Sequence, residues 1–452
     1  MPEAASGWGS CSTPLAEYHD VLLLDLDGVV YVGPQAVPGA PEALELARRS
    51  GARLAYVTNN AARTPDVVAR HLTDLGVPAE PTDVVTSAQA AAAILAAELP
   101  EGARVLAIGG EGLRQALSAR GLTPVASAED GPVAVVQGFA PETSWGMLLE
   151  ACVAVNAGLP WVATNLDLTI PTPRGTAPGN GALVQVVRTA TGATPRVAGK
   201  PFRPLMDESC ERTGAVRPLV VGDRLDTDIA GAHAADLPSL LVLTGVSGAT
   251  DLLQATPELR PTYLAADTSG LHQPHEAPRR EGTAWVGRGC RASWAEVDGE
   301  AELDGATNAD AAPDSAALRL VLEPLDDSGL GGQTTAAGSV LAVDGTAPNA
   351  GPFASPAAGS TGPLQPTASL LDIKGSPRAV TVATDEAASS AETAGVPAPG
   401  DTVTALVDAM RVVCAAVWER VDAAADGAER ERIIAAGQQA LRPWTTGFER
   451  GR

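Results

Sequence analysis

The segment VLLLDLDG, residues 21–28, places four consecutive apolar side chains directly before a pair of aspartates. A short, continuous apolar run of this kind is typical of a strand that is buried on both faces of a parallel sheet. Helix-like segments, such as PEALELARRSG at 41–51, alternate with such runs. The alternation predicts an α/β fold built on a doubly wound parallel sheet. Similar apolar runs recur at 53–59, 105–110, 133–138, 161–165, 218–223 and 239–245.

The composition narrows the classes of partner. The 452 residues include 54 acidic and 31 basic side chains, which gives a formal net charge of −23. Such a surface repels nucleic acid and anionic lipid, so we expect neither as a partner. No apolar run reaches 18 residues and the N-terminus does not resemble a signal peptide, so we expect a cytoplasmic protein without a membrane span. Five scattered cysteines without a CxxC pair argue against a zinc site and a disulfide framework.

Two polar clusters follow predicted strands within the first 60 residues. Asp25 and Asp27 are two residues apart on an extended segment, so their carboxylates project to the same side. Acids this close repel one another unless a cation lies between them, and Mg²⁺ prefers carboxylate oxygens. Thr58, Asn59 and Asn60 offer hydroxyl, amide and backbone N–H groups that suit a phosphate oxygen. Judged alone, the first cluster is also a common surface turn, and the second is more often a helix cap.

Two further clusters lie beyond residue 195. Lys200, within Gly-Lys-Pro, is one of only two lysines in the chain and would be a point charge for a phosphate or a carboxylate. The segment GDRLDTDI, residues 222–229, places Asp223, Asp226 and Asp228 at another strand end, where three carboxylates favour a nearby cation. A solvated lysine and a solvated acidic loop are the alternatives. Strand ends of an open parallel sheet meet at one edge, where ligands bind.

Taken together, the motifs DLDGVVY (25–31), VTNNAART (57–64), GKP (199–201) and GDRLDTDI (222–229) resemble those of the haloacid dehalogenase (HAD) superfamily. They are most similar to subclass IIA phosphatases, which carry a large C2-type cap between the second and third motifs. Relatives of this kind act on phosphoglycolate, glycerol 3-phosphate, 4-nitrophenyl phosphate or nucleotides. The resemblance covers about residues 18–271 and implies a Rossmann-like HAD core with an inserted α/β cap.

The resemblance implies a role for each acidic residue. Asp25 would be the nucleophile that forms an aspartyl-phosphate. Asp27 would be the general acid and base, and its backbone carbonyl would bind Mg²⁺ together with Asp25 and Asp223. Asp228 would act through water or orient the metal ligands.

The resemblance also assigns the substrate-binding residues. Thr58, Asn59 and Asn60 would hold the phosphoryl oxygens, and Lys200 would neutralise charge shared between the phosphate and Asp25. Phosphoryl transfer requires such positioning together with positive charge where the equatorial oxygens accumulate negative charge. In the cap segment ATNLDLTIPTPRGTAPGNGALV (163–184), the candidate specificity residues are Asn165, Asp167, Arg174 and the turn Gly179-Asn180-Gly181, each of which could equally be an ordinary loop residue.

The chain is predicted to contain a core at 15–82 and 196–272, a cap at 83–195, and a low-complexity or disordered linker at 273–400. Within that linker, ASWAEVDGEAEL suggests a hairpin at 283–303, centred on the Asp298-Gly299 pair. An amphipathic helix is predicted at 401–425, which we expect to pack on the hairpin or the core rather than on a partner. The turn GGEG (109–112) is a weak candidate for a phosphate loop in the cap.

The sequence therefore predicts a Mg²⁺-dependent phosphatase for a small phosphorylated metabolite, such as glycerol 3-phosphate or phosphoglycolate. A nucleotide monophosphatase of the same family and a non-catalytic phospho-accepting or binding module are the alternatives. A homodimer formed through the cap is a further expectation. All of this depends on Asp25 and Asp223 lying close enough to share one metal ion.

Overall fold

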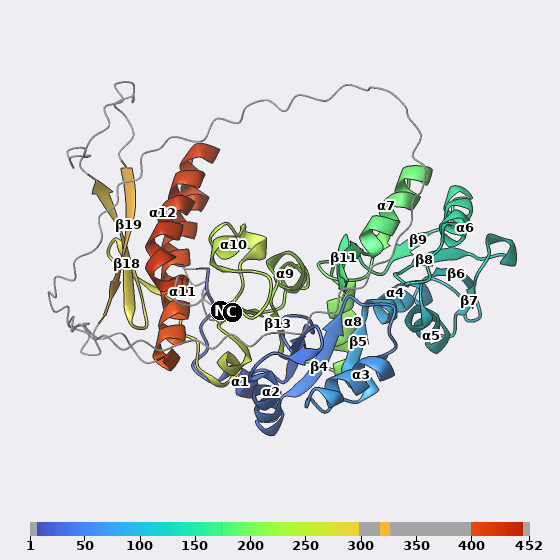
Figure 1. The fold of residues 1–452 in the computed structure, drawn as a ribbon, viewed down its shortest axis with the longest axis horizontal. Helices are drawn as coiled ribbons and strands as arrows, with labels where there is room; N and C mark the ends of the chain where they lie inside the picture. Colours follow the sequence, from blue (N-terminus) through green and yellow to red (C-terminus); the bar gives the residue numbers. More distant parts are fainter. Residues whose placement is uncertain (1–6, 173, 298–316, 326–398, 446–452) are drawn as a thin grey trace, which may run out of the picture. The chain divides into compact units, whose positions relative to one another are not determined.

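The computed structural model describes residues 7–172, 174–297, 317–325 and 399–445. Its largest sheet has six parallel strands in the order β15-β14-β13-β1-β4-β5. Figure 1 labels β4, β5 and β13 of this sheet. The predicted doubly wound parallel sheet is confirmed. The strands are β1 (Val21–Leu24), β4 (Arg53–Thr58), β5 (Val84–Thr86), β13 (Pro218–Gly222), β14 (Ser239–Val242) and β15 (Tyr263–Ala265).

Strand β1 lies between β13 and β4 and is buried along its whole length. Its side chains alternate between two apolar clusters, because successive residues of a strand face opposite sides of the sheet. Leu22 and Leu24 share a cluster with residues of α1 (Leu15–Tyr18), α2 (Ala40–Arg49) and α3 (Pro65–Asp74). Val21 and Leu23 share another with residues of α4 (Ser87–Ala96), α8 (Pro204–Thr213) and α9 (Ala230–Ala234). Helices therefore cover both faces.

A second parallel sheet has the order β12-β9-β8-β6-β7. Its strands are β6 (Arg104–Ile108), β7 (Thr123–Val125), β8 (Ala134–Gln137), β9 (Trp161–Ala163) and β12 (Arg196–Val197). Helices α6 (Trp145–Asn156) and α7 (Asn180–Thr191) pack with one face, and α5 (Glu111–Ala119) joins the cluster that contains α4. One continuous apolar cluster thus connects this inserted sheet to the six-stranded sheet.

Short elements complete these two parts. The hairpin of β10 (Thr169–Thr172) and β11 (Gly175–Pro178) precedes α7, and the hairpin of β2 (Tyr31–Val32) and β3 (Gln35–Ala36) follows β1. Single 3-10 turns are η1 (Pro81–Asp83), η2 (Ala128–Asp130), η4 (Pro257–Leu259) and η5 (Thr268–His272).

The chain changes sheets a few residues later than the predicted cap borders at 83 and 195. Strand β5 lies beyond the first border, yet it pairs with β4 in the six-stranded sheet. Strand β12 lies beyond the second border, yet it pairs with β9 in the inserted sheet. Both strands are only two or three residues long, so their apolar pattern is too short to reveal which sheet they join.

An antiparallel sheet of order β16-β17-β18-β19 follows in the chain. Its strands are β16 (Arg279–Glu281), β17 (Ala284–Gly287), β18 (Cys290–Val297) and β19 (Ala317–Pro324). A two-residue turn joins β17 to β18, and its Gly289 has a φ of 76°, which favours glycine. Strand β18 also pairs with β19, whose Leu320 and Leu322 provide apolar side chains, and the predicted hairpin turn at Asp298-Gly299 lies outside the described residues. The rest of the predicted linker, at 298–316 and 326–398, lies outside the described residues.

Two long helices, α11 (Pro399–Ala423) and α12 (Gly427–Thr445), follow this sheet. The sequence predicted α11 but not α12, whose apolar residues are interrupted by charged and amide side chains. Trp418 of α11 stacks on Trp8 with the ring centroids 5.0 Å apart, and its Nε1 donates to the Leu252 carbonyl at 3.0 Å. The same cluster contains Trp285 of β17. Helix α11 therefore packs on β17 and on the core, in agreement with the expectation that it would pack on the hairpin or the core.

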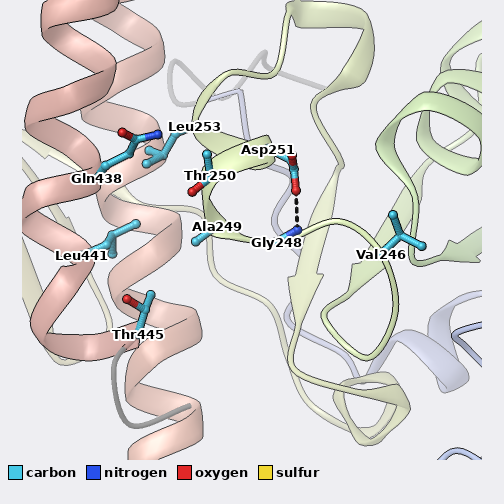
Figure 2. A pocket seen from close by; sticks show the side chains of 9 residues that line it. All are labelled: Val246, Gly248, Ala249, Thr250, Asp251, Leu253, Gln438, Leu441 and Thr445. Carbon is cyan, nitrogen blue, oxygen red and sulfur yellow. Dashed lines mark hydrogen bonds between the residues drawn. The ribbon is translucent and has the colours of Figure 1, made fainter. Parts of the chain in front are cut away.

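A cavity of about 270 Å³ lies between α12 and the segment that contains α10 (Ala249–Leu253), as Figure 2 shows. Its lining includes Leu441 and Thr445 from α12 and Thr250 and Asp251 from α10. None of the clusters singled out in the sequence lines it. No helix among the described residues has the length and apolar character needed to cross a membrane.

We expect Trp418→Ala to destabilise the full chain by about 3–5 kcal/mol, because truncating a large buried aromatic residue leaves a cavity. The free energy of unfolding would be measured by urea denaturation. Val32→Ala is the control, because Val32 is 57% exposed and its truncation should change stability by less than about 0.5 kcal/mol. Equal midpoints for the two variants would show that α11 does not stabilise the core.

Candidate active site

Three acidic side chains meet at the carboxyl edge of the six-stranded sheet. Asp25 follows β1, and Asp223 follows the neighbouring strand β13. The backbone N–H of Asp25 donates to the Val221 carbonyl at 2.8 Å, which fixes the two strand ends side by side. One carboxylate oxygen from each of Asp25, Asp223 and Asp228 lies within 4.8 Å of the other two. The prediction that segments about 200 residues apart meet at this edge is confirmed.

The local backbone holds Asp228 towards Asp25. Residues Leu225–Ile229 form a π-helical turn, η3, a rare conformation that is frequent at functional sites. Within this turn the Asp228 carboxylate accepts a hydrogen bond from the backbone N–H of Arg224 at 3.2 Å. A Cβ atom at Gly222 would lie 2.2 Å from the Cβ of Asp228, so only glycine fits there.

The loop after β14 holds Asp223. Its Oδ2 accepts from the backbone N–H of Val246 at 2.7 Å, and its backbone carbonyl accepts from the N–H of Ser247 at 3.0 Å. A Cβ at Gly28 or Gly245 would lie 2.5 or 1.9 Å from Oδ2, so both glycines are needed for this approach. The sequence analysis missed this loop, although it directly follows the predicted strand 239–245. A search at that strand's carboxyl end would have found it.

These acids fit a divalent cation. Oδ1 of Asp223 is buried and has no hydrogen-bond partner among the described residues, which suits a metal ligand. Burial raises the pKa of Asp25 well above its usual range, although Lys200 opposes the shift. Burial, and then the nearby Asp228, raise the pKa of Asp223 to about 6. The three carboxylates therefore repel one another, and a cation among them would relieve the repulsion.

Lys200 provides the one buried ammonium group among the described residues of this site. Its Nζ donates to Asp25 Oδ1, to Asp228 Oδ1 at 2.7 Å, and to the Val57 carbonyl at 3.2 Å. Burial alone would lower the pKa of Lys200, but the carboxylates of Asp228 and Asp25 outweigh burial and raise it. One ammonium against three carboxylates still leaves an excess of negative charge, which is the condition for binding Mg²⁺.

Asn59 fixes the position of Lys200. Its Oδ1 accepts from the Lys200 backbone N–H at 2.8 Å, and its Nδ2 donates to the Lys200 carbonyl at 3.0 Å. The same Nδ2 lies 3.3 Å from both carboxylate oxygens of Asp167 in the cap. The side chain of Asn59 thus bonds to Lys200 and Asp167, contacts that the sequence analysis did not anticipate when it assigned Asn59 to a phosphoryl oxygen.

Thr58 and Asn60 shape the turn that follows β4. The Thr58 hydroxyl accepts from the backbone N–H of Asn60 at 3.1 Å. The Asn60 carboxamide oxygen accepts from the backbone N–H groups of Ala62 at 2.9 Å and Arg63 at 3.2 Å. Thr58 is buried and Asn60 is exposed. The turn is therefore well defined before any ligand binds.

Asp27 lies outside the three-carboxylate cluster. Its side chain is exposed, yet the surrounding protein reduces its hydration and raises its pKa, while Arg63, Lys200 and His71 oppose the shift. A carboxyl group with a raised pKa is suited to donate and then accept a proton. The following Gly28 has a φ of 84°, so the chain turns sharply after Asp27.

The candidate specificity residues of the cap lie in different environments. Asn165 is 4% exposed and donates to the Asn59 carbonyl at 2.7 Å, and Asn180 is 1% exposed and donates to the Asn165 carbonyl at 2.8 Å. The Asn165 side chain therefore holds the cap segment to the turn after β4, and the Asn180 side chain holds the backbone of Asn165. Arg174 is exposed in the β10–β11 turn. Asp167 is the one candidate whose charged group contacts Asn59.

Two family models match the chain. The haloacid dehalogenase-like hydrolase model matches residues 22–123, and the HAD-hydrolase-like model matches residues 197–271. D-glycerol 3-phosphate phosphatase of Mycobacterium tuberculosis is 54% identical over 259 residues, which cover 57% of this chain and 72% of the relative. Acid sugar phosphatase of Staphylococcus aureus is 36% identical over 251 residues, which cover 55% of this chain and 95% of the relative.

Solved structures agree with these matches. Glycerol phosphate phosphatase of Mycobacterium tuberculosis, in complex with magnesium, is 51% identical, with a TM-score of 0.58 over 61% of this chain and 84% of that one. The 4-nitrophenylphosphatase of Thermotoga maritima is 30% identical, with a TM-score of 0.53 over 57% of this chain and 98% of that one. Together with the cluster of acids and Lys200 at the predicted sheet edge, these matches show that the chain belongs to the haloacid dehalogenase-like hydrolases.

Proposed function

We propose that this chain is a Mg²⁺-dependent phosphatase that hydrolyses a small phosphomonoester, with glycerol 3-phosphate as the preferred substrate. One observation carries the proposal: the Lys200 ammonium group lies between Asp25 and Asp228, beside Asp223, at the ligand-binding edge of a parallel sheet. The arrangement combines a carboxylate nucleophile with fixed positive charge, which phosphoryl transfer requires.

The reaction divides into two displacements. A carboxylate oxygen of Asp25 attacks phosphorus, the bond from phosphorus to the ester oxygen breaks, and the carboxyl group of Asp27 gives its proton to the departing alcohol. Asp27, now ionised, takes a proton from water, whose oxygen attacks phosphorus and displaces Asp25. The products are the alcohol and inorganic phosphate, and both aspartates return to their first states.

Lys200 and the metal ligands provide the electrostatics of this reaction. Lys200 remains protonated and partly neutralises Asp25 in both steps. Asp25, Asp223 and the backbone carbonyl of Asp27 would hold Mg²⁺, with Asp228 keeping Lys200 in place. When bound, the ion would supply positive charge to the phosphoryl oxygens.

Two observations favour glycerol 3-phosphate over phosphoglycolate. The relative that is 54% identical carries the name D-glycerol 3-phosphate phosphatase. A leaving group with its own carboxylate would face the carboxylate of Asp167 on the cap side, and like charges repel. A hydroxylated leaving group could instead donate a hydrogen bond to Asp167. Nucleotides remain the second candidate within the family.

Phosphate release would be measured to test the proposal. The substrates are glycerol 3-phosphate, phosphoglycolate, nucleoside monophosphates and 4-nitrophenyl phosphate. We expect Asp25→Asn to abolish turnover of every ester, because an amide is not a nucleophile. Asp27→Asn should lower kcat by about 10²- to 10⁴-fold, because it removes the general acid. Asp226→Asn is the matched control, because this exposed residue pairs with Arg224 and should keep wild-type turnover. An active Asp25→Asn variant, or a wild type without activity, would contradict the proposal.

Binding of Mg²⁺ should weaken as the pH falls through about 6. The raised pKa of Asp223 means that this carboxyl group takes up a proton in that range, and the proton competes with the metal. Isothermal titration calorimetry of the wild type with Mg²⁺ at pH 7.5 and at pH 5.5 would measure the change in affinity for the ion. Asp223→Asn should bind the ion weakly at both values. Equal wild-type affinity at both values would argue against Asp223 as a ligand.

We also propose that two copies pair through the cap. Helix α6 exposes Trp145, Leu149 and Val153, four residues apart on one face, at 75%, 41% and 51% of their surface. The acidic residue of this helix, Glu150, is held inward by the Ser127 hydroxyl and the Ala128 N–H. An uncharged apolar stripe is where two chains of net charge −23 can meet with least repulsion.

Light scattering coupled to size-exclusion chromatography would test this pairing. We expect a dimer for the wild type and a monomer for Trp145→Glu, because each copy would then place a charge in the apolar contact. Val216→Glu is the control, because Val216 is 79% exposed and lies outside the cap. A monomeric wild type, or a dimeric Trp145→Glu variant, would overturn the proposal.

A further inference from the structure

The GGEG turn of the cap contacts the core segment Ala61–Arg63, which connects β4 to α3. Gly110 precedes α5 and Gly112 is the second residue of that helix. The backbone N–H of Gly112 donates to the Ala62 carbonyl at 3.2 Å. Both glycines are buried, so this contact excludes water. Sequence analysis had offered this turn as a phosphate loop, but its contacts are with the core chain.

The two glycines permit a close approach that a larger residue would disturb, slightly at Gly110 and strongly at Gly112. A Cβ at Gly112 would lie 2.5 Å from the Arg63 carbonyl oxygen and 2.8 Å from that of Ala61. A Cβ at Gly110 would lie 3.2 Å from the Ala62 carbonyl oxygen. All of these are backbone atoms, which cannot rotate away as a flexible side chain can. A side chain at either position must therefore displace the core segment, and more so at Gly112.

The displaced segment is continuous with the proposed phosphate-binding turn. The carboxamide of Asn60 accepts hydrogen bonds from the N–H groups of Ala62 and Arg63. The N–H of Asn60 in turn donates to the Thr58 hydroxyl. These bonds span only six residues, so a shift at Ala61–Arg63 changes the positions of Asn60 and Thr58. From the cap, Asn165 holds the neighbouring Asn59 carbonyl.

We propose that Gly110 and Gly112 are positioning residues for the active site: they form a glycine seat in the cap that sets the geometry of the Thr58–Arg63 turn. The cap thereby determines how tightly the phosphoryl group binds, in addition to any contact it makes with the leaving group. This inference rests on the proposed function, because it assigns the turn to phosphate binding. The seat itself contacts neither Asp25 nor Asp223, which are held by strand ends and by the loop after β14, so we expect a displaced turn to affect phosphate binding more than Mg²⁺ binding.

Three glycine-to-alanine variants of the full chain test the seat. Gly112→Ala should raise KM for glycerol 3-phosphate and the inhibition constant of inorganic phosphate by about tenfold, which is less than the roughly 10²-fold loss that a full 1 Å misplacement can cause. Gly110→Ala should give a smaller rise in the same two constants. Gly146→Ala is the matched control, because Gly146 is also the second residue of a cap helix and its Cβ would meet only Ser144 Oγ, at 3.6 Å. The Mg²⁺ concentration for half-maximal rate should change less than KM in Gly112→Ala and Gly110→Ala, and should remain that of the wild type in Gly146→Ala.

Hydrogen exchange provides a readout that does not depend on turnover. In Gly112→Ala, the amides of Asn60, Ala62 and Arg63 should exchange faster than in the wild type and in Gly146→Ala, because their acceptors move. Gly110→Ala serves the same purpose if Gly112→Ala does not fold. Wild-type KM, phosphate inhibition and exchange in a folded Gly112→Ala or Gly110→Ala variant would overturn the seat. A wild type that hydrolyses no phosphate ester would instead overturn the proposed function, and the exchange result would still decide whether the seat exists.

Discussion

The site depends on one interaction, the contact of the buried Lys200 ammonium group with the carboxylates of Asp25 and Asp228. Three acids at a sheet edge would repel one another and open the fold if no positive charge lay among them. The lysine is 3% exposed and receives its position from Asn59, which binds the backbone on both sides of the lysine side chain. Charge balance therefore links β1, β4, β13 and the segment that returns from the cap.

Residues of both the cap and the core take part in the hydrogen bonds that position Lys200. Asn59 bonds to Lys200 on the core side and to Asp167 on the cap side. An apolar cluster extends from β1 through α4 to the inserted sheet, so the two parts have a common core. A cap built in this way can exclude water from the phosphoryl group without supplying a catalytic group of its own.

Much of the fold and of the site could be predicted, because it follows from patterns within short segments of the sequence. The apolar run 21–24 indicated a strand buried on both faces, and acids at strand ends indicated where the site would lie. The role of Asn59 could not be predicted, because its partners, Lys200 and Asp167, are more than 100 residues away in the sequence. Helix α12 was missed because charged and amide side chains interrupt its apolar residues. The pairing of β18 with β19 was missed because the two strands are separate in the sequence and come together only in the fold, in one apolar cluster with α11.

The contact between Trp8 and the helix α11 bears on how the protein is made. The indole of Trp8 donates to the carbonyl of Arg411, 403 residues later, and its ring stacks on Trp418. On the ribosome, Trp8 emerges 403 residues before Arg411, so its surface stays uncovered until α11 has been made. Synthesis at about 5–20 residues per second makes this delay tens of seconds, during which an apolar face of the phosphatase body stays open to chaperones and to other nascent chains.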